Sequence, residues 1–323
     1  MSLYFQGKSE IDHDPAQKAA LESRDNAVVI AGPVSGKTRV LALKVAQLLK
    51  EEVSPPQGIA CLTFTRVMAK ELEDRLYCLG ISEHPNITVS TVHGFCLGEV
   101  LKPFIEVFDT GIPQPIRIAP QQVQDRILGD LQKRIVPAKK FSSFKKNFLV
   151  LRRKRIDFLP EQWEDYSEYL EAINLYQERM FASGFVDFDI IVEKALKLIL
   201  EQEVVRKMLS SRFPWFVVDE YQDLGYPLFR IVTEMMDRTK IHLFAIGDPD
   251  QSIYDFMGTD PKYLLALKAR NDVTPYELVQ NYRCASEVME VAYVVLGQKR
   301  PYTTVNSNGR IRCYFCPSNF PQQ

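Results

Sequence analysis

The sequence contains 323 residues, of which 46% are hydrophobic and 25% are charged. These proportions are typical of a globular protein of about two domains, and they exclude disordered, collagen-like and low-complexity chains. No apolar run approaches the roughly 18 residues of a membrane span, so no membrane partner is expected. The net charge is only −1, but ten of the 40 Lys and Arg residues lie in residues 133–155, which contain no Asp or Glu. This asymmetry suggests an anionic partner for that segment.

The six cysteines are scattered and follow no secretory signal, so we expect reduced thiols and a cytoplasmic protein. Cys313 and Cys316 form one CxxC pair, but a zinc site needs four ligands and no second pair lies nearby. Residues 1–7 (MSLYFQG) look like the remainder of a protease-cleavable expression tag and are excluded from the fold prediction.

Short, nearly continuous apolar runs recur along the chain, each followed by a helix-length segment. Runs of this kind are typical of strands that are covered on both faces, and they predict an α/β fold with a parallel sheet. The predicted strands are 27–30, 59–64, 87–90, 216–218, 242–246 and 276–279. A further stretch, 309–315, alternates like a strand.

About 125 residues with a helical pattern separate the third and fourth predicted strands. The economical interpretation is a helical insertion, after which a helix at 189–201 returns the chain to the sheet. We therefore predict a first motor segment at 8–102, a helical insertion at 103–183, a second motor segment at 184–283 and the start of another domain at 284–323.

Residues 31–38 (AGPVSGKT) follow a predicted strand and precede the helical run 39–49, which is the context that a P-loop requires. Small residues allow backbone N–H groups to cradle phosphate oxygens at a helix N-terminus. Lys37 is expected to reach the β- and γ-phosphates of a nucleotide, and the Thr38 hydroxyl to bind Mg²⁺. The predicted nucleotide contacts in this loop are Ala31, Gly32, Pro33, Val34, Ser35, Gly36, Lys37 and Thr38.

Carboxylates follow two other predicted strands. Asp219 and Glu220 end an apolar strand, where Asp219 is the candidate Mg²⁺ partner and Glu220 the candidate base for an attacking water. One strand on, Gln251 can touch both the γ-phosphate and that water. Either acidic cluster alone would also suit a solvated loop, whereas together with a P-loop they predict an NTPase site.

These residues resemble superfamily 1 DNA helicases of the UvrD/Rep/PcrA group, over nearly the whole chain outside the insertion. One motif is weak evidence, but an ordered set is highly specific. The set is the P-loop together with 14–20 (DPAQKAA), 62–66 (LTFTR) running on to Glu71 and Arg75, 88–95 (TVSTVHGF), 218–223 (VDEYQD), 247–254 (GDPDQSIY) and 280–283 (QNYR). The resemblance implies a RecA-like P-loop NTPase sheet with an inserted helical subdomain.

The resemblance also implies roles for individual residues. Gln17 matches the glutamine that reads the adenine edge, and Arg39 and Tyr282 match the pair that sandwiches the adenine. Arg283 matches the arginine that reaches the γ-phosphate, where a cation stabilises developing charge. The residues in segments that line the single-strand track are Phe64, Thr91, His93, Tyr254 and Phe256. Phe95, in the same segment as His93, is expected in the core.

Three positions depart from the family pattern. Val34 stands where glycine is usual, and a β-branched residue is strained wherever the loop needs a positive φ. The stretch 255–258 (DFMG) lacks an expected arginine, and Arg66-Val67 replaces Asn-Lys. The later family motifs are absent, so we expect a fragment with a half-built ATP site and little turnover.

Cations recur at intervals of six or seven residues in the insertion, interleaved with phenylalanines. This spacing returns them to one helix face, and we expect that face to contact DNA beside a duplex. The paired cations are Lys139 and Lys140, Lys145 and Lys146, and Arg152 and Arg153.

The sequence therefore predicts the N-terminal motor half of an ATP-dependent DNA helicase that uses ATP and Mg²⁺. The resemblance implies single-stranded DNA and single-strand/duplex junctions as partners, 3′–5′ movement, a role in DNA repair, replication or recombination, and a place near the bacterial nucleoid. One alternative is a P-loop regulatory or DNA-binding ATPase whose turnover Val34 has weakened. Another is a small-molecule kinase, which DNA-stimulated ATP hydrolysis would exclude.

Overall fold

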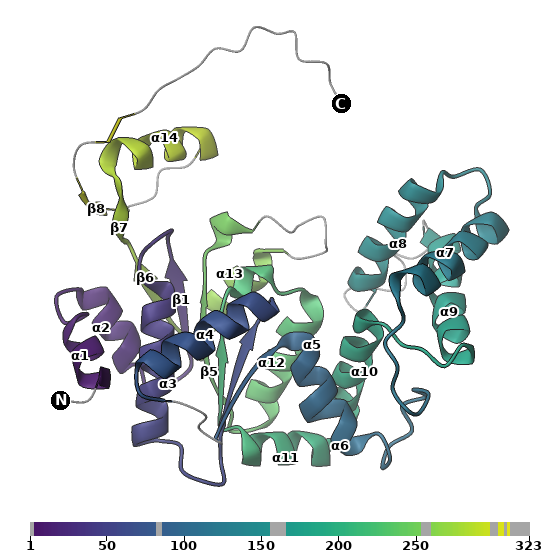
Figure 1. The fold of residues 1–323 in the computed structure, drawn as a ribbon, viewed down its shortest axis with the longest axis horizontal. Helices are drawn as coiled ribbons and strands as arrows, with labels where there is room; N and C mark the ends of the chain where they lie inside the picture. The colour runs from purple at the N-terminus through teal and green to yellow at the C-terminus, as the bar shows by residue number, and fades with distance from the viewer. Residues whose placement is uncertain are drawn as a thin grey trace, which may run out of the picture.

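The computed structural model describes residues 3–81, 86–155, 166–252, 260–297, 303–306 and 309–310. Its centre is a six-stranded parallel sheet with the order β3-β2-β4-β5-β1-β6 (Figure 1). The strands are β1 (Ala27–Ala31), β2 (Ile59–Thr63), β3 (Ile87–Thr91), β4 (Trp215–Val218), β5 (His242–Gly247) and β6 (Thr274–Leu278). The six predicted strands from 27–30 to 276–279 are confirmed, with ends that differ by at most two residues.

The register of the sheet aligns the carboxyl ends of its central strands. Ile30 of β1 pairs with Gly247 of β5, and Val218 of β4 pairs with Ala245 of β5. The loops that follow these strands therefore leave the same edge of the sheet, where open α/β sheets bind ligands.

Helices cover both faces of the sheet, because successive side chains of a buried strand point to opposite sides. Val29 packs with the helices of one layer and Val28 with those of the other. The first layer comprises α2 (Pro15–Glu22), α3 (Lys37–Glu51) and α4 (Arg66–Cys78). The second comprises α5 (Val92–Phe95), the π-helical turn Cys96–Leu101, α6 (Lys102–Phe104), α10 (Phe188–Glu201), α11 (Glu203–Arg212), α12 (Tyr226–Arg238) and α13 (Lys262–Lys268).

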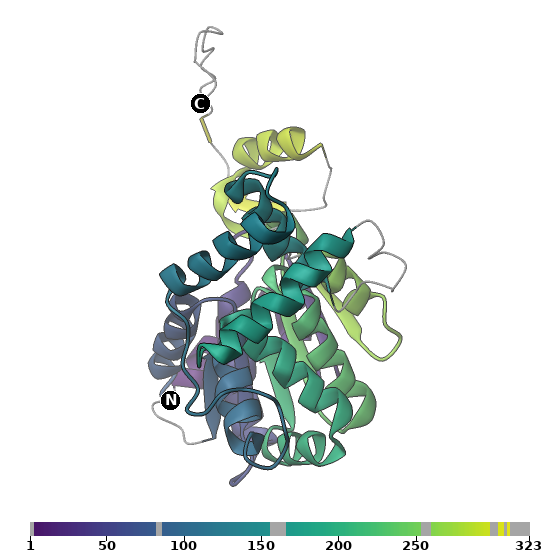
Figure 2. The ribbon, with the colours of Figure 1, turned by 90° about the vertical axis from the view of Figure 1, so that its right-hand side faces the viewer.

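The helical insertion stands beside the sheet (Figures 1 and 2), and its buried side chains belong to the same apolar core. It contains α7 (Gln121–Ile135), α8 (Phe141–Lys154) and α9 (Ser167–Ala182). Phe144 and Phe148 of α8 belong to the same apolar cluster as Phe216 of β4, and Phe95 is buried there as predicted. The predicted helix at 189–201 is confirmed as α10, whereas the domain boundaries stay predictions.

A buried lysine fixes the end of α2. Lys44 of α3 is fully buried, donates hydrogen bonds to the carbonyls of Leu21 and Ser23, and lies over the rings of Trp215 and Phe244. Burial lowers the pKa of Lys44 to about 8. Since Gln17 lies on α2 and Asp14 caps its N-terminus, this anchor helps to position both residues.

The first residues are also structured. Helix α1 (Leu3–Ser9) places Tyr4 in a small core with Ile11, Leu21 and Leu43. The expectation that residues 1–7 are a tag remainder stays a prediction. None of the described helices is long and apolar enough to span a bilayer.

After β6 the chain leaves the central sheet. Strand β7 (Gln280–Ala285) pairs with β8 (Thr303–Asn306), and α14 (Ser286–Leu296) follows β7 (Figure 1). The predicted boundary at 283/284 therefore falls inside β7. Of the predicted strand 309–315, only residues 309 and 310 are described, and they lie outside any strand; Cys313 and Cys316 lie outside the described residues.

A buried ion pair joins the insertion to the helix that returns to the sheet. Arg152 of α8 donates two hydrogen bonds of 2.6 Å to Asp187, which caps the N-terminus of α10. Tyr176 of α9 also donates to Asp187, at 2.9 Å. Burial alone would raise the pKa of Asp187, but the charge and hydrogen bonds of Arg152 outweigh it and hold that pKa below its usual value.

We predict that Arg152→Met destabilises the fold by about 3–5 kcal/mol at pH 7, because it leaves the Asp187 carboxylate buried without its cation. Denaturant unfolding monitored by circular dichroism measures this change. Lys146→Met is the control, since Lys146 is an exposed cation on the same helix and should cost less than about 0.5 kcal/mol. Equal losses for the two variants would contradict the assigned role of the ion pair.

Candidate nucleotide-binding site

The predicted P-loop connects β1 to α3, and α3 begins at Lys37. Gly36 has a φ of 87°, a conformation that favours glycine, and a Cβ there would lie 2.8 Å from the Gln17 amide nitrogen. Gln17 donates this amide to the Ser35 carbonyl at 2.9 Å, so α2 packs directly against the loop.

Val34 adopts the left-handed backbone conformation. The sequence analysis identified this conformation as strained for a valine at this position. Its φ is 59°, and a β-branched side chain is strongly disfavoured there. Such strain costs on the order of 1–3 kcal/mol, and surrounding contacts must offset it. The loop thus keeps the backbone path that suits glycine although it carries valine.

Three predicted catalytic residues meet beyond the loop. The Lys37 ammonium lies 3.2 Å from a carboxylate oxygen of Glu220 and donates to the side-chain oxygen of Gln251 at 3.1 Å. Glu220 follows β4, and Gln251 ends the 3-10 turn Pro249–Gln251 after β5. Both acceptors thus come from the aligned edge of the sheet.

Gln222 orients the candidate base, a role that the sequence prediction missed. Its amide donates to the Glu220 carboxylate at 2.9 Å, and its side-chain oxygen accepts from the backbone N–H of Asp248 at 2.9 Å. Only 1% of Gln222 is exposed. Gln222 lies in the 3-10 turn Tyr221–Asp223, two residues after Glu220, and no local sequence pattern marks this contact.

The charged forms of two carboxylates at this edge, Asp219 and Asp223, are disfavoured. Burial, followed by the charge of Glu220, raises the pKa of Asp219 to about 7. The same two causes raise the pKa of Asp223 to about 6. A cation bound here would relieve both costs.

The predicted magnesium ligands fit that ion in donor chemistry. The Thr38 hydroxyl and the Asp219 carboxylate supply oxygen, which Mg²⁺ prefers. Within the described ranges, no three His, Cys, Asp or Glu side chains are arranged to hold a metal.

The residues predicted to hold the adenine lie around α2. The Tyr282 hydroxyl donates to the Asp14 carboxylate at 2.7 Å. Burial and then this hydrogen bond raise the pKa of Tyr282 to about 12. Arg39 forms a half-exposed ion pair with Glu10 at 3.4 Å. Asp14, which also caps α2, had no predicted role of its own.

Arg283 is not joined to the Lys37 cluster. It is exposed, and no hydrogen bond or ion pair links its guanidinium to another side chain in the described part of the chain. Its predicted role at the γ-phosphate stays a prediction.

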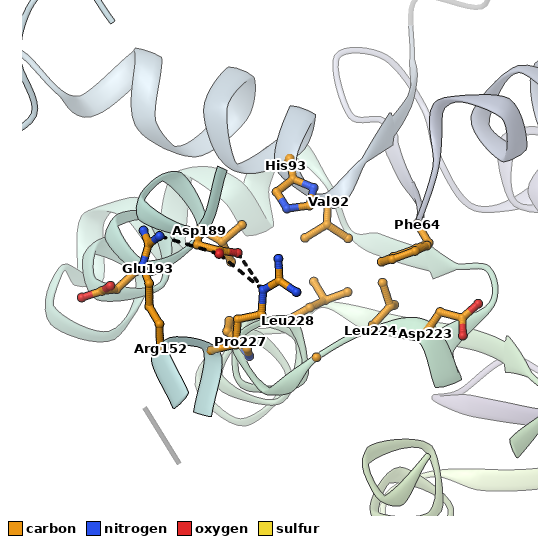
Figure 3. A pocket seen from close by; sticks show the side chains of 13 residues that line it. Phe64, Val92, His93, Arg152, Asp189, Glu193, Asp223, Leu224, Pro227 and Leu228 are labelled. Atoms are coloured by element: carbon orange, nitrogen blue, oxygen red, sulfur yellow. Dashed lines mark hydrogen bonds and ion pairs between the residues drawn. The ribbon is translucent and has the colours of Figure 1, made fainter. Parts of the chain in front are cut away.

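A separate pocket of about 180 Å³ lies between the sheet edge and the insertion (Figure 3). Phe64 and His93, two residues of the predicted DNA track, face into it, and Asp223 and Leu224 continue its wall from the Glu220 segment. Burial lowers the pKa of His93, so its ring is neutral at pH 7. Thr91 instead caps α5 by accepting from the N–H of Gly94.

Comparison with known proteins identifies the family. Residues 13–272 match the UvrD/REP helicase N-terminal domain. The chain belongs to this family. It is 28% identical over 292 residues to the ATP-dependent DNA helicase PcrA of Bacillus subtilis (strain 168), covering 88% of this chain and 39% of the relative.

Two further relatives are also named as DNA helicases. The PcrA helicase of Staphylococcus aureus (strain Mu50) is 27% identical over 304 residues, covering 89% of this chain and 41% of the relative. DNA helicase II of Salmonella typhimurium (strain LT2) is 28% identical over 311 residues. This match covers 93% of this chain and 41% of the relative. The chain thus spans about two fifths of the length of these relatives.

The basic segment of this UvrD/REP-type domain differs from the predicted cationic face. The prediction that Arg152 lies on an exposed cationic face is wrong, because Arg152 is 5% exposed and bound to Asp187. Its contact with DNA stays a prediction. Phe144, Phe148 and Leu151 form the apolar stripe of α8, and Arg152 lies at its border. A seven-residue spacing alone does not reveal this border.

Half of the other cations whose side chains the structure describes in this segment are paired with acids on neighbouring helices, among them Arg155 with Glu193 at 3.8 Å. Lys145 lies 2.6 Å from Asp125, and Arg153 lies 3.2 Å from Asp189. Lys139 pairs with Glu168 at 3.2 Å. Of the described side chains here, the exposed cations that form no ion pair are Lys133, Arg134, Lys140 and Lys146. Tyr254 and Phe256 lie outside the described residues.

We predict that Asp219→Asn stabilises the protein increasingly as pH rises from 4 to 7. The folded carboxyl, with a pKa of about 7, binds its proton more tightly than the unfolded one, with a pKa of about 3.9. The free energy of unfolding of the wild type therefore falls as the pH rises from 4 to 7. Above pH 7 the total loss reaches a value on the order of 4 kcal/mol.

Urea unfolding in EDTA, repeated from pH 4 to 8, measures this difference. Asp25→Asn, at an exposed position, controls for the loss of one negative charge. A difference between wild type and Asp219→Asn that does not change with pH would rule out the assigned titration.

Proposed function

We propose that this chain is the nucleotide-binding motor half of an ATP-dependent DNA helicase that uses Mg²⁺ and acts on single-stranded DNA and its junctions with duplex. The observation that carries the proposal is the contact of Lys37 with both Glu220 and Gln251. These three side chains come from different segments of the chain and meet beside the P-loop. The names of the relatives support the same activity.

The arrangement suggests how the site works. Phosphate oxygens compete with Glu220 and Gln251 for the Lys37 ammonium, because a cation binds best where negative charge is greatest. Once Lys37 turns to the phosphates, the Glu220 carboxylate is available to accept a proton from water, in the orientation that Gln222 maintains. Gln251 then remains to position that water. Bound Mg²⁺ supplies positive charge that neutralises the phosphate oxygens.

DNA contact is proposed at the pocket that holds Phe64 and His93. An aromatic face can stack on any base, which suits binding without sequence preference. The wall of this pocket continues through Asp223 to Glu220, so the two sites share one short segment. The exposed cations Lys140 and Lys146 are the proposed contacts with DNA phosphates on the insertion. Movement in the 3′–5′ direction belongs to the proposal through the family resemblance.

One observation favours the alternative of a DNA-binding ATPase with weak turnover. The φ of 59° at Val34 places a strained residue in the loop that must hold the phosphates. The presence of four residues that each have a distinct task in ATP hydrolysis favours the helicase motor. They are Lys37, Asp219, Glu220 and Gln251. Nucleotide binding and single-turnover hydrolysis together separate the two.

We predict that Lys37→Ala weakens binding of a non-hydrolysable Mg-ATP analogue at least 100-fold, because charge-assisted bonds to phosphate oxygens are lost. Isothermal titration calorimetry measures the affinity. Lys50→Ala is the matched control, since Lys50 lies at the opposite end of the same helix. If Lys37→Ala binds as tightly as wild type, the P-loop assignment fails.

We further predict that Phe64→Ala weakens binding of a fluorescent oligo-dT strand by a factor between about 5 and 150, which corresponds to the roughly 1–3 kcal/mol of one base stack. Fluorescence anisotropy at fixed salt measures the affinity. Tyr77→Ala removes an exposed aromatic ring of α4 that does not line the pocket, and it should leave the affinity unchanged. Parallel losses in both variants would contradict a specific role for Phe64.

A further inference from the structure

Three successive carbonyl groups of the P-loop accept hydrogen bonds from outside the loop. The distances are 2.9, 3.3 and 2.9 Å for the carbonyls of Pro33, Val34 and Ser35. The respective donors are the Asn281 side-chain amide, the Tyr282 backbone N–H and the Gln17 side-chain amide. The strained residue Val34 is therefore the centre of a loop segment held from two sides, by β7 and by α2.

These bonds determine where the loop points its N–H groups. In a planar trans peptide the carbonyl of one residue and the N–H of the next point in opposite directions. Binding the Pro33 and Ser35 carbonyls outside the loop therefore turns the N–H groups of Val34 and Gly36 the other way. A concave set of such N–H groups is what binds phosphate oxygens.

Asn281 holds the loop and a second functional segment with one side chain. It is 2% exposed, and its amide nitrogen donates to Pro33. Its side-chain oxygen accepts from the backbone N–H of Arg283 at 2.9 Å and of Cys284 at 2.7 Å. The backbone of Arg283, the predicted γ-phosphate arginine, is thus tied to the P-loop through a single amide.

We propose that Asn281 is a positioning residue, which holds the P-loop in the left-handed conformation at Val34 and couples it to the Arg283 segment. Its effect on nucleotide affinity rests on the proposed function, whereas its effect on the loop does not. Glycine adopts a positive φ freely, so a loop with glycine at position 34 needs this restraint much less. The dependence on Asn281 is therefore specific to a chain that carries valine there.

The test compares wild type, Asn281→Ala, Val34→Gly and the double variant. Without nucleotide, hydrogen exchange followed by mass spectrometry reports the N–H groups of Ser35 and Tyr282, which bond to Gly32 and Val34 in the held loop. We expect Asn281→Ala to speed exchange in peptides 31–38 and 279–285 about tenfold. In the Val34→Gly background the same substitution should speed exchange in peptide 31–38 less than about threefold.

Calorimetry with the Mg-ATP analogue on the same four proteins tests the link to nucleotide. We expect Asn281→Ala to weaken binding about tenfold, which equals about 1.4 kcal/mol, and Val34→Gly to restore most of that loss. If wild type binds no nucleotide, the proposed function fails, while hydrogen exchange still decides whether Asn281 holds the loop.

Asn26→Ala is the matched control for loss of a bridging amide. The Asn26 side chain also joins two backbone segments, Leu243 and Asp272, but it precedes β1 at the opposite edge of the sheet. It should leave P-loop exchange and nucleotide affinity unchanged. The proposal is overturned if Asn281→Ala has no effect on exchange, if its effect is equal with valine and glycine at position 34, or if Asn26→Ala reproduces it.

Discussion

The parallel register of β1, β5 and β4 is the constraint on which the candidate site depends. Ile30 lies opposite Gly247 and Val218 opposite Ala245, so three loops begin within one edge of the sheet. Each loop contributes one polar group to a common point. A shift of one residue in either pairing would turn the side chains that follow to the other face. The buried, apolar strands that resist such a shift are therefore as necessary to the candidate site as its polar side chains.

The candidate site combines backbone strain with closely spaced negative charge, and contacts within the site offset part of each cost. Val34 and Glu220 both have positive φ values, of 59° and 46°, and Asp219 has a pKa raised by burial and by Glu220. Lys37 offsets part of this negative charge through its contact with Glu220. Local strain and perturbed acidity concentrate where a site is built to bind something that relieves them. A cation bound here would relieve the charge repulsion at this site.

The sheet and the P-loop could be read from the sequence because their signals are local. An apolar run ended by a glycine-rich loop specifies its own structure, and the concern about Val34 followed from a single position. The contacts of Asn281 with Pro33 and of Gln222 with Glu220 were not predictable in this way. They depend on which segments the fold brings together, and an amide side chain has no periodicity that announces its partner. The predicted exposure of Arg152 was wrong for a related reason. Its burial depends on Asp187, which caps another helix, α10.

The pocket beside Phe64 depends on the contact between the insertion and the sheet layer. Its wall takes Phe64 and Leu224 from loops at the sheet edge and Arg152 from the insertion (Figure 3). The same apolar cluster runs through both parts, and Arg152 is fixed at their junction by Asp187. A shift of α8 against β4 would therefore change the shape of the pocket and, through Asp223, the environment of Glu220. Because packed cores rearrange between discrete states rather than deform continuously, the packing of the insertion against the sheet layer determines the shape of this pocket.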